Sequence, residues 1–143
     1  MNKYTKQDIM DLVEEEDVEF IRLQFVDVFG TLKNLAVTTS QLDKVLNNEC
    51  MFDGAAIDGF KGNNMSELFL KPQLDTFAIF PWRPQQGKVA RFLCDVVYED
   101  GTPFEGDSRY ILQNVLNQAA EMGYTFQAVS YTHLRAHETR GNL

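Results

Sequence analysis

The chain has 143 residues, 44% apolar and 24% charged, values typical of one soluble globular domain or of one domain with part of another. Its net charge is −8 and its basic residues form no run, which disfavours nucleic-acid binding through phosphates. Two cysteines without metal-ligand spacing, a polar start unlike a signal peptide and the lack of a long apolar run predict a cytoplasmic protein that does not bind membranes.

The first elements are predicted from capping residues and apolar spacing. Thr5 and Asp8 resemble a capping box, and the helix that they begin should end in the acidic run 14–17. Alternation in 18–25 predicts a half-buried strand, and DVFGT (27–31) supplies a turn. The strand is expected to bury Ile21, Leu23 and Phe25, with Arg22 and Gln24 on its other face.

The next segment, LKNLAVT (32–38), reads as the returning strand of a hairpin. Thr39 or Ser40 should then cap a short helix. Its apolar stripe is Leu42, Val45 and Leu46. The glycine-rich region 50–75 is expected to be a long loop.

FAIFPW (77–82) and KVARFLCDVV (88–97) read as two further strands, and Arg91 and Asp95 of the second could pair with each other. A helix should follow, with an Asp or Ser cap and a stop at Gly123. YTFQA (124–128) then begins another strand. The order of elements predicts an α+β fold, a β-grasp-like arrangement of a small mixed sheet with helices, followed by a helix.

The segment MFDGAAIDGFKGNNMSELFLKP (51–72) displays several charged side chains between anchoring apolar ones. The charged residues are Asp53, Asp58, Lys61 and Glu67. Taken alone, the segment is typical of a surface loop with solvated charges.

Several blocks occur together and in order: FIRLQFVDVFGTLKN, MFDGAAIDGF, FAIFPW, GKVARFLCDV and DGTPFEGDSR. From about Tyr4 to Ala128 the chain resembles the amino-terminal domain of type I glutamine synthetase, in its Gram-positive-like branch. The resemblance implies a β-grasp domain over 1–105 and, over 106–128, the start of a catalytic domain that is cut short. It further implies a homo-oligomer, a dodecamer of two hexameric rings with active sites between adjacent subunits.

The resemblance assigns one catalytic residue to this chain. The aspartate of the family's FDGSS loop binds ammonium and takes its proton in the neighbouring subunit's site, and it matches Asp53. The resemblance also implies that Gly54, Ser66 and Glu67 are supporting residues of this loop. The family's two serines are replaced by alanines at 55 and 56, which removes their hydroxyl hydrogen bonds.

The implied reaction is the ATP-dependent ligation of ammonia to L-glutamate through γ-glutamyl phosphate, a step of glutamine biosynthesis and nitrogen metabolism. The parent would use ATP with Mg²⁺ or Mn²⁺, whose ligands begin in a Gly-Pro-Glu-x-Glu-Phe-Phe strand that this chain lacks. Because phosphoryl transfer depends on such metals and cations, the fragment alone is expected to be inactive and to bind no cofactor.

The segment 129–143 holds both histidines, His133 and His137, with Glu138 beside the second. Residues four apart share a helix face, but three ligands without the H-E-x-x-H order are a poor zinc site. Codons for VSYTHLRAHET can spell a transposon-based sequencing-library adapter in reverse complement. We therefore interpret this tail as non-native and expect it to be disordered.

A second reading remains open. A free-standing β-grasp module that binds or regulates a partner, without catalysis, would share the predicted fold. A natural stop after Leu143 in the genomic DNA would favour that module.

Overall fold

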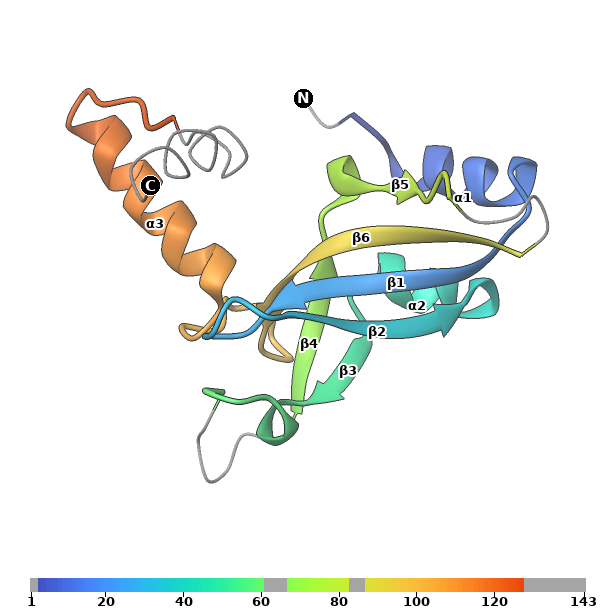
Figure 1. Cartoon of the computed structure of the whole chain (residues 1–143), viewed down its shortest axis with the longest axis horizontal. Helices are drawn as coiled ribbons and strands as arrows, with labels where there is room; N and C mark the ends of the chain where they lie inside the picture. Colours follow the sequence, from blue (N-terminus) through green and yellow to red (C-terminus); the bar gives the residue numbers. More distant parts are fainter. Residues whose placement is uncertain (1–2, 61–66, 83–86, 128–143) are drawn as a thin grey trace, which may run out of the picture. The chain divides into compact units, whose positions relative to one another are not determined.

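The computed structural model describes residues 3–60, 67–82 and 87–127 (Figure 1). The chain divides into two compact units, Met1–Ile111 and Leu112–Leu143. The tail with His133 and His137 lies outside the described residues. In the described part of the chain, no helix has the length and apolar character needed to cross a membrane. The domain boundary expected after residue 105 stays a prediction.

The first unit contains a mixed sheet (Figure 1). Its strands are β1 (Val18–Val26), β2 (Leu32–Thr38), β3 (Cys50–Asp53), β4 (Glu67–Pro72), β5 (Ala78–Ile79) and β6 (Lys88–Val97). The order is β2-β1-β6-β4-β3, and β5 pairs with β6. β1 and β6 are parallel, and the other pairs are antiparallel. The parallel central pair with antiparallel neighbours confirms the predicted α+β class.

The helices in the described residues are α1 (Lys6–Glu15), α2 (Leu42–Leu46) and α3 (Ser108–Glu121), with short 3₁₀ turns η1 (Thr39–Gln41), η2 (Gly54–Ala56) and η3 (Leu74–Thr76). Two of these three helices, α1 and α3, begin at polar capping residues. The capping box of α1 is confirmed: Asp8 N donates to Thr5 Oγ1 at 3.2 Å, and Thr5 N donates to the Asp8 carboxylate at 2.7 Å. At the start of α3, Arg109 N donates to Asp107 Oδ1 at 3.3 Å.

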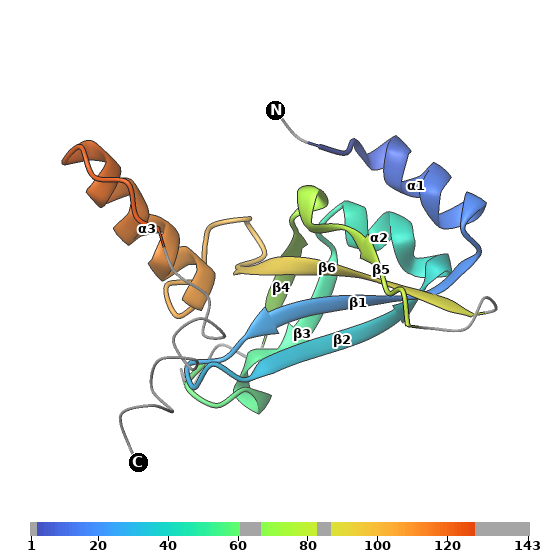
Figure 2. The ribbon, with the colours of Figure 1, turned by 45° about the horizontal axis from the view of Figure 1, so that its top comes forward.

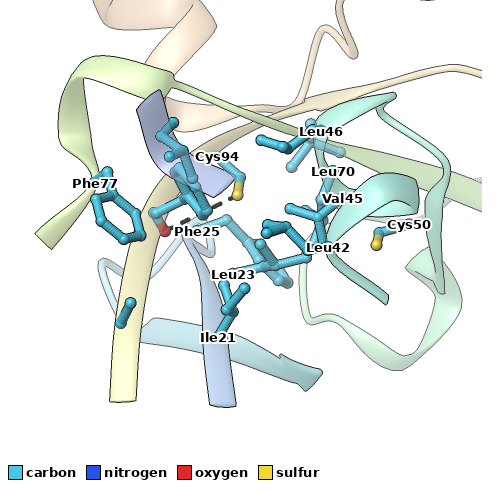
Figure 3. Packing of buried hydrophobic residues seen from close by; sticks show 14 of the residues in the cluster. Ile21, Leu23, Phe25, Leu42, Val45, Leu46, Cys50, Leu70, Phe77 and Cys94 are labelled. Atoms are coloured by element: carbon cyan, nitrogen blue, oxygen red, sulfur yellow. Dashed lines mark hydrogen bonds between the residues drawn. The ribbon is translucent and has the colours of Figure 1, made fainter. Parts of the chain in front are cut away.

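The hydrophobic core lies between one face of the sheet and the helices α1 and α2 (Figures 2 and 3). The sheet contributes Ile21, Leu23, Phe25, Leu68, Leu70, Ala90, Phe92, Cys94 and Val96. The helices contribute Ile9, Val13, Leu42, Val45 and Leu46. Each large side chain that is fully buried in this way stabilises the fold by about 1.5–3 kcal/mol. The predicted alternation of β1 and β6 and the stripe of α2 are confirmed.

Three predicted element boundaries are wrong. The region 50–75 is not one long loop, because β3 and β4 pair within it and are joined through the segment between them. The strand expected over 77–82 is limited to β5, because proline at 81 has no N–H with which to continue the hydrogen bonding of the sheet. The expected strand at 124–128 is absent from its described part, residues 124–127.

The predicted cap of α2 is also wrong. The helix α2 is capped by neither Thr39 nor Ser40: its N-cap is Gln41, which makes no side-chain cap bond, while Ser40 Oγ lies 2.7 Å from Thr38 Oγ1. Gln24 lies, as expected from strand alternation, on the face opposite Leu23 and Phe25. It is buried, and its Oε1 accepts a hydrogen bond from Arg91 Nη1 at 3.4 Å.

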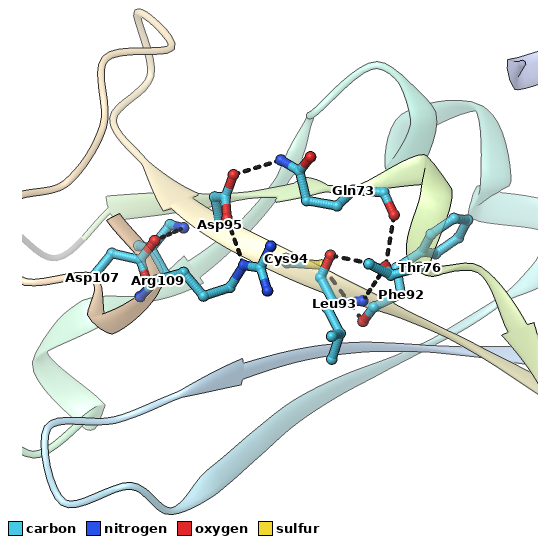
Figure 4. A network of polar contacts seen from close by, with 9 residues as sticks. Gln73, Thr76, Phe92, Leu93, Cys94, Asp95, Asp107 and Arg109 are labelled. Atoms are coloured by element: carbon cyan, nitrogen blue, oxygen red, sulfur yellow. Dashed lines mark hydrogen bonds and ion pairs between the residues drawn. The ribbon is translucent and has the colours of Figure 1, made fainter. Parts of the chain in front are cut away.

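Arg91 does not pair with Asp95. Residues four apart on a strand are separated by roughly 13 Å, too far for an ion pair. Asp95 instead accepts from Arg109 Nε at 2.8 Å and from the Gln73 side-chain amide (Figure 4). This network joins β6 to the start of α3 within the first unit.

Candidate functional site

The loop aspartate, Asp53, is the last residue of β3 and caps the turn η2. Its Oδ1 accepts a hydrogen bond from Ala55 N at 2.9 Å. The side chains of Asp53 and Ala55 are exposed, while Gly54 is buried. A backbone N–H therefore holds the carboxylate, and alanine at 55 does not prevent this bond.

Asp53 and Glu67 are directly paired residues at the ends of β3 and β4. Side chains on directly opposed residues of an antiparallel pair lie on the same face, and two carboxylates placed so repel each other. Both residues are exposed. The arrangement presents two negative groups at the adjoining ends of β3 and β4, which favours the approach of a small cation. Ser66, the third expected loop residue, lies outside the described residues.

Aromatic contacts hold the chain on both sides of the Asp53 turn, through Phe52 in β3 and Phe60 beyond η2. The Phe52 ring lies 4.9 Å from that of Phe25, and the Phe60 ring lies 6.2 Å from it. Phe60 is 1% exposed and packs edge-on against Phe104 with the ring centroids 5.0 Å apart. Such contacts stabilise by about 0.5–1.5 kcal/mol beyond burial. The core thus anchors the segment on either side of the exposed Asp53 turn.

Two surface clefts lie elsewhere on the described structure. One, of about 390 Å³, is lined by residues that include Asn48, Lys71 and Glu99. The other, of about 330 Å³, is lined by residues that include Lys6 and Lys71. Neither contains Asp53 or Glu67. The loop therefore presents its carboxylates on an open surface rather than in one of these clefts.

Sequence reasoning identified Asp53 and Glu67 separately but missed their direct pairing. The signal was available in the apolar residues at 68 and 70, which alternate as a strand next to the loop. The many glycine and asparagine residues between β3 and residue 68 favoured the interpretation of the whole region as a loop.

The mixed sheet with its covering helices is a β-grasp-like domain, and it presents acidic side chains at the adjoining ends of β3 and β4. A family profile described as "Glutamine synthetase, beta-Grasp domain" matches residues 17–99. The chain therefore belongs to the glutamine synthetase family, through its β-grasp domain.

The relatives support this assignment. The chain is 62% identical over 125 residues to a glutamine synthetase of Clostridium saccharobutylicum, a match that covers 87% of this chain and 28% of that protein. It is 54% identical over 122 residues to a glutamine synthetase of Staphylococcus aureus strain N315, covering 85% of this chain and 27% of that protein. The chain thus spans less than a third of the length of these relatives, and their Gram-positive sources agree with the branch that the sequence indicated.

Two solved structures share the fold. A cryo-electron microscopy structure of Plasmodium falciparum glutamine synthetase matches with a TM-score of 0.73 and 17% identity, covering 86% of this chain and 24% of that one. A structure titled "Apo GmaS without ligand" matches with a TM-score of 0.71 and 24% identity, covering 81% and 27%. At these identities the likeness concerns the fold alone.

Proposed function

We propose that this chain is the amino-terminal part of a glutamine synthetase subunit and that its Asp53 loop completes the ammonium site of an adjacent subunit. The parent would be a cytoplasmic homododecamer that ligates ammonia to L-glutamate with ATP. The family assignment supports the reaction class. The paired, exposed carboxylates of Asp53 and Glu67 are the observation that carries the proposal for this loop.

The chemistry explains why a carboxylate is needed there. Ammonium is a cation and cannot act as a nucleophile until it loses a proton. A carboxylate near the reacting carbonyl both attracts the cation and accepts that proton. Two carboxylates on facing residues strengthen the attraction, and a neighbouring subunit that excludes water strengthens it further. Asp53 takes the proton, and Glu67 contributes charge.

We assign ATP and Mg²⁺ or Mn²⁺ to the remaining part of the parent protein. Across residues 3–60, 67–82 and 87–127, no three His, Cys, Asp or Glu side chains are grouped so as to hold a metal ion. The bound metals would supply charge stabilisation for phosphoryl transfer. The proposed contribution of this chain is limited to holding ammonium and its proton.

A chimera tests the proposal. The matched 125 residues of this chain, without the tail 129–143, would replace their counterparts in the Clostridium saccharobutylicum glutamine synthetase, and kcat/KM would be measured for ammonium. Asp53→Asn should lower it by roughly 100-fold or more, the usual range for loss of an acid–base group. Hydroxylamine, a nucleophile that is neutral near pH 7, should be affected much less. Asp58→Asn, an exposed aspartate of the same segment, is the matched control.

The outcomes separate the two candidate functions. Near-normal ammonium kinetics in Asp53→Asn would remove Asp53 from the mechanism. A chimera that assembles but makes no glutamine would favour the partner-binding module. Independent sequencing of the gene across the Ala128–Val129 junction adds a second test, because continuation into Gly-Pro-Glu-x-Glu is expected for a synthetase.

A further inference from the structure

The turn between β1 and β2 touches the segment that follows β3 (Figure 2). Gly59 has a φ of +86°, in the left-handed region that favours glycine. A Cβ added there would lie 2.3 Å from Cγ2 and 2.7 Å from Cγ1 of Val28. The Gly59 backbone therefore lies in direct contact with the Val28 side chain.

Asp27 fixes the turn that carries Val28. Its Oδ1 accepts hydrogen bonds from Phe29 N at 2.9 Å and Thr31 N at 2.8 Å, and its Oδ2 lies 3.5 Å from Lys33 Nζ. Burial of the Asp27 side chain opposes ionisation, but these backbone hydrogen bonds and Lys33 hold its pKa below the ordinary value. The carboxylate is thus ionised at neutral pH and locks the turn in one conformation.

Two residues near the end of β1, Phe25 and Val28, contact the chain around the Asp53 turn. Phe25, one residue before the end of β1, contacts the rings of Phe52 and Phe60 on either side of the loop. Val28, just beyond that end, contacts Gly59. The ring contacts fix the ends of the segment, whereas the Val28 contact bears on the backbone between them.

We propose that the Val28–Gly59 contact, braced by Asp27, positions the loop that carries Asp53. Asp27 and Val28 are positioning residues, because they act through the loop and not on the substrate. The inference rests on the proposed function of Asp53 as the ammonium carboxylate. Asp53 is exposed and bonded to its own turn through Ala55 N, so the place of its carboxylate depends on where that turn is held.

The test uses the same chimera and three variants. Gly59→Ala should push the loop away from Val28 and lower kcat/KM for ammonium by roughly 10- to 100-fold, the cost of a displacement of about 1 Å at a reacting group. The value for hydroxylamine should change far less. Adding Val28→Ala removes both Cγ atoms from the path of the new methyl but leaves Val28 Cβ at 3.0 Å and the positive φ of residue 59, so it should recover part of the loss. Asp27→Asn should lower the ammonium value in the same direction.

Two controls separate positioning from general damage. Asp100 accepts a hydrogen bond from Thr102 N at 2.9 Å in another turn. Asp100→Asn therefore removes a matched carboxylate and should leave kcat/KM unchanged for both ammonium and hydroxylamine. Val28→Ala alone removes only part of a side chain that is 49% exposed and should fold. It tests the contact even if Gly59→Ala does not fold, and it should lower the ammonium value.

The inference is overturned if Gly59→Ala and Val28→Ala leave the ammonium kinetics unchanged. It is also overturned if both nucleophiles lose activity equally and the double variant brings no recovery, since that pattern describes a purely structural role. Asp53→Asn distinguishes failure of the positioning inference from failure of the proposed function. If it lowers ammonium use and the Gly59 and Val28 variants do not, only the positioning inference fails; if it has no effect, the proposed function fails as well.

Discussion

Asp107 accepts a hydrogen bond from the backbone N–H of Val96 at 3.1 Å, and this bond ties the start of α3 to β6. The carboxyl is 1% exposed. Burial raises the pKa of Asp107 above its ordinary value of 3.8, although hydrogen bonds from Val96, Arg109 and Tyr110 act in the opposite direction. A buried acid of this kind makes the stability of the first unit depend on pH.

The pH dependence has a defined sign. Because the folded-state pKa of Asp107 is raised, its contribution to the free energy of unfolding is fully present below 3.8 and is lost as the pH rises through the folded pKa. Each pKa unit of difference corresponds to about 1.4 kcal/mol. The free energy of unfolding of the wild type minus that of Asp107→Asn should therefore fall as the pH rises above 3.8, as measured by urea denaturation at several pH values.

Asp100→Asn provides a control of opposite sign. Hydrogen bonds from the Thr102 hydroxyl and backbone N–H lower the pKa of Asp100. Its contribution to stability is therefore present above the ordinary value and is lost only as the pH falls below 3.8. If the stability difference between the wild type and Asp107→Asn stays flat or grows with pH, the folded-state pKa of Asp107 is not raised.

The second prediction concerns the aromatic anchors of the loop. Phe60 is 1% exposed whereas Phe29 is 76% exposed. Phe60→Ala should lower the free energy of unfolding by about 3–5 kcal/mol, the usual cost of a cavity left by a buried phenylalanine. Phe29→Ala, the same change at a surface position, should stay within about 0.5 kcal/mol of the wild type. Chemical denaturation of both variants checks this, and equal losses would contradict the assigned burial.

The parts of the fold that the sequence predicted are those set by local patterns. The hairpin 18–38 follows from alternation on either side of a glycine turn, and α1 follows from its capping box. The fold class followed from the order of such elements. The family resemblance added the identity of the loop that carries Asp53.

The parts that the sequence missed depend on contacts between distant residues. β3 has only four residues, and its strand character comes from pairing with β4 rather than from its own pattern. The sequence near Asp95 did not indicate that this residue would pair with Arg109 instead of Arg91. The ion pair between Arg109 and Asp95 forms only because α3 begins beside β6. The contact of Val28 with Gly59 also joins residues that are distant in the sequence. The motif DVFGT predicted the turn that carries Val28 but not the segment that the turn contacts.

The last prediction concerns the two thiols, which occupy different depths of the sheet. Cys94 is 0% exposed on the central strand β6, whereas Cys50 is 8% exposed on the edge strand β3. Burial raises the pKa of both thiols. Since the thiolate is the reactive form, both should react slowly with iodoacetamide in the folded chain. An edge strand opens locally more easily than a central one, so Cys50 should be labelled first and Cys94 only on global unfolding.

Mass spectrometry of the single-thiol variants Cys50→Ser and Cys94→Ser separates the two rates. In guanidinium both thiols should react at the rate of an unfolded chain, which controls for intrinsic reactivity. Under native conditions the opening free energy for Cys94 should equal the global free energy of unfolding measured by denaturation. Labelling of Cys94 as fast as that of Cys50 would mean that β6 opens without the rest of the sheet. The parallel pairing of β1 with β6 would then not be the stable centre of the domain.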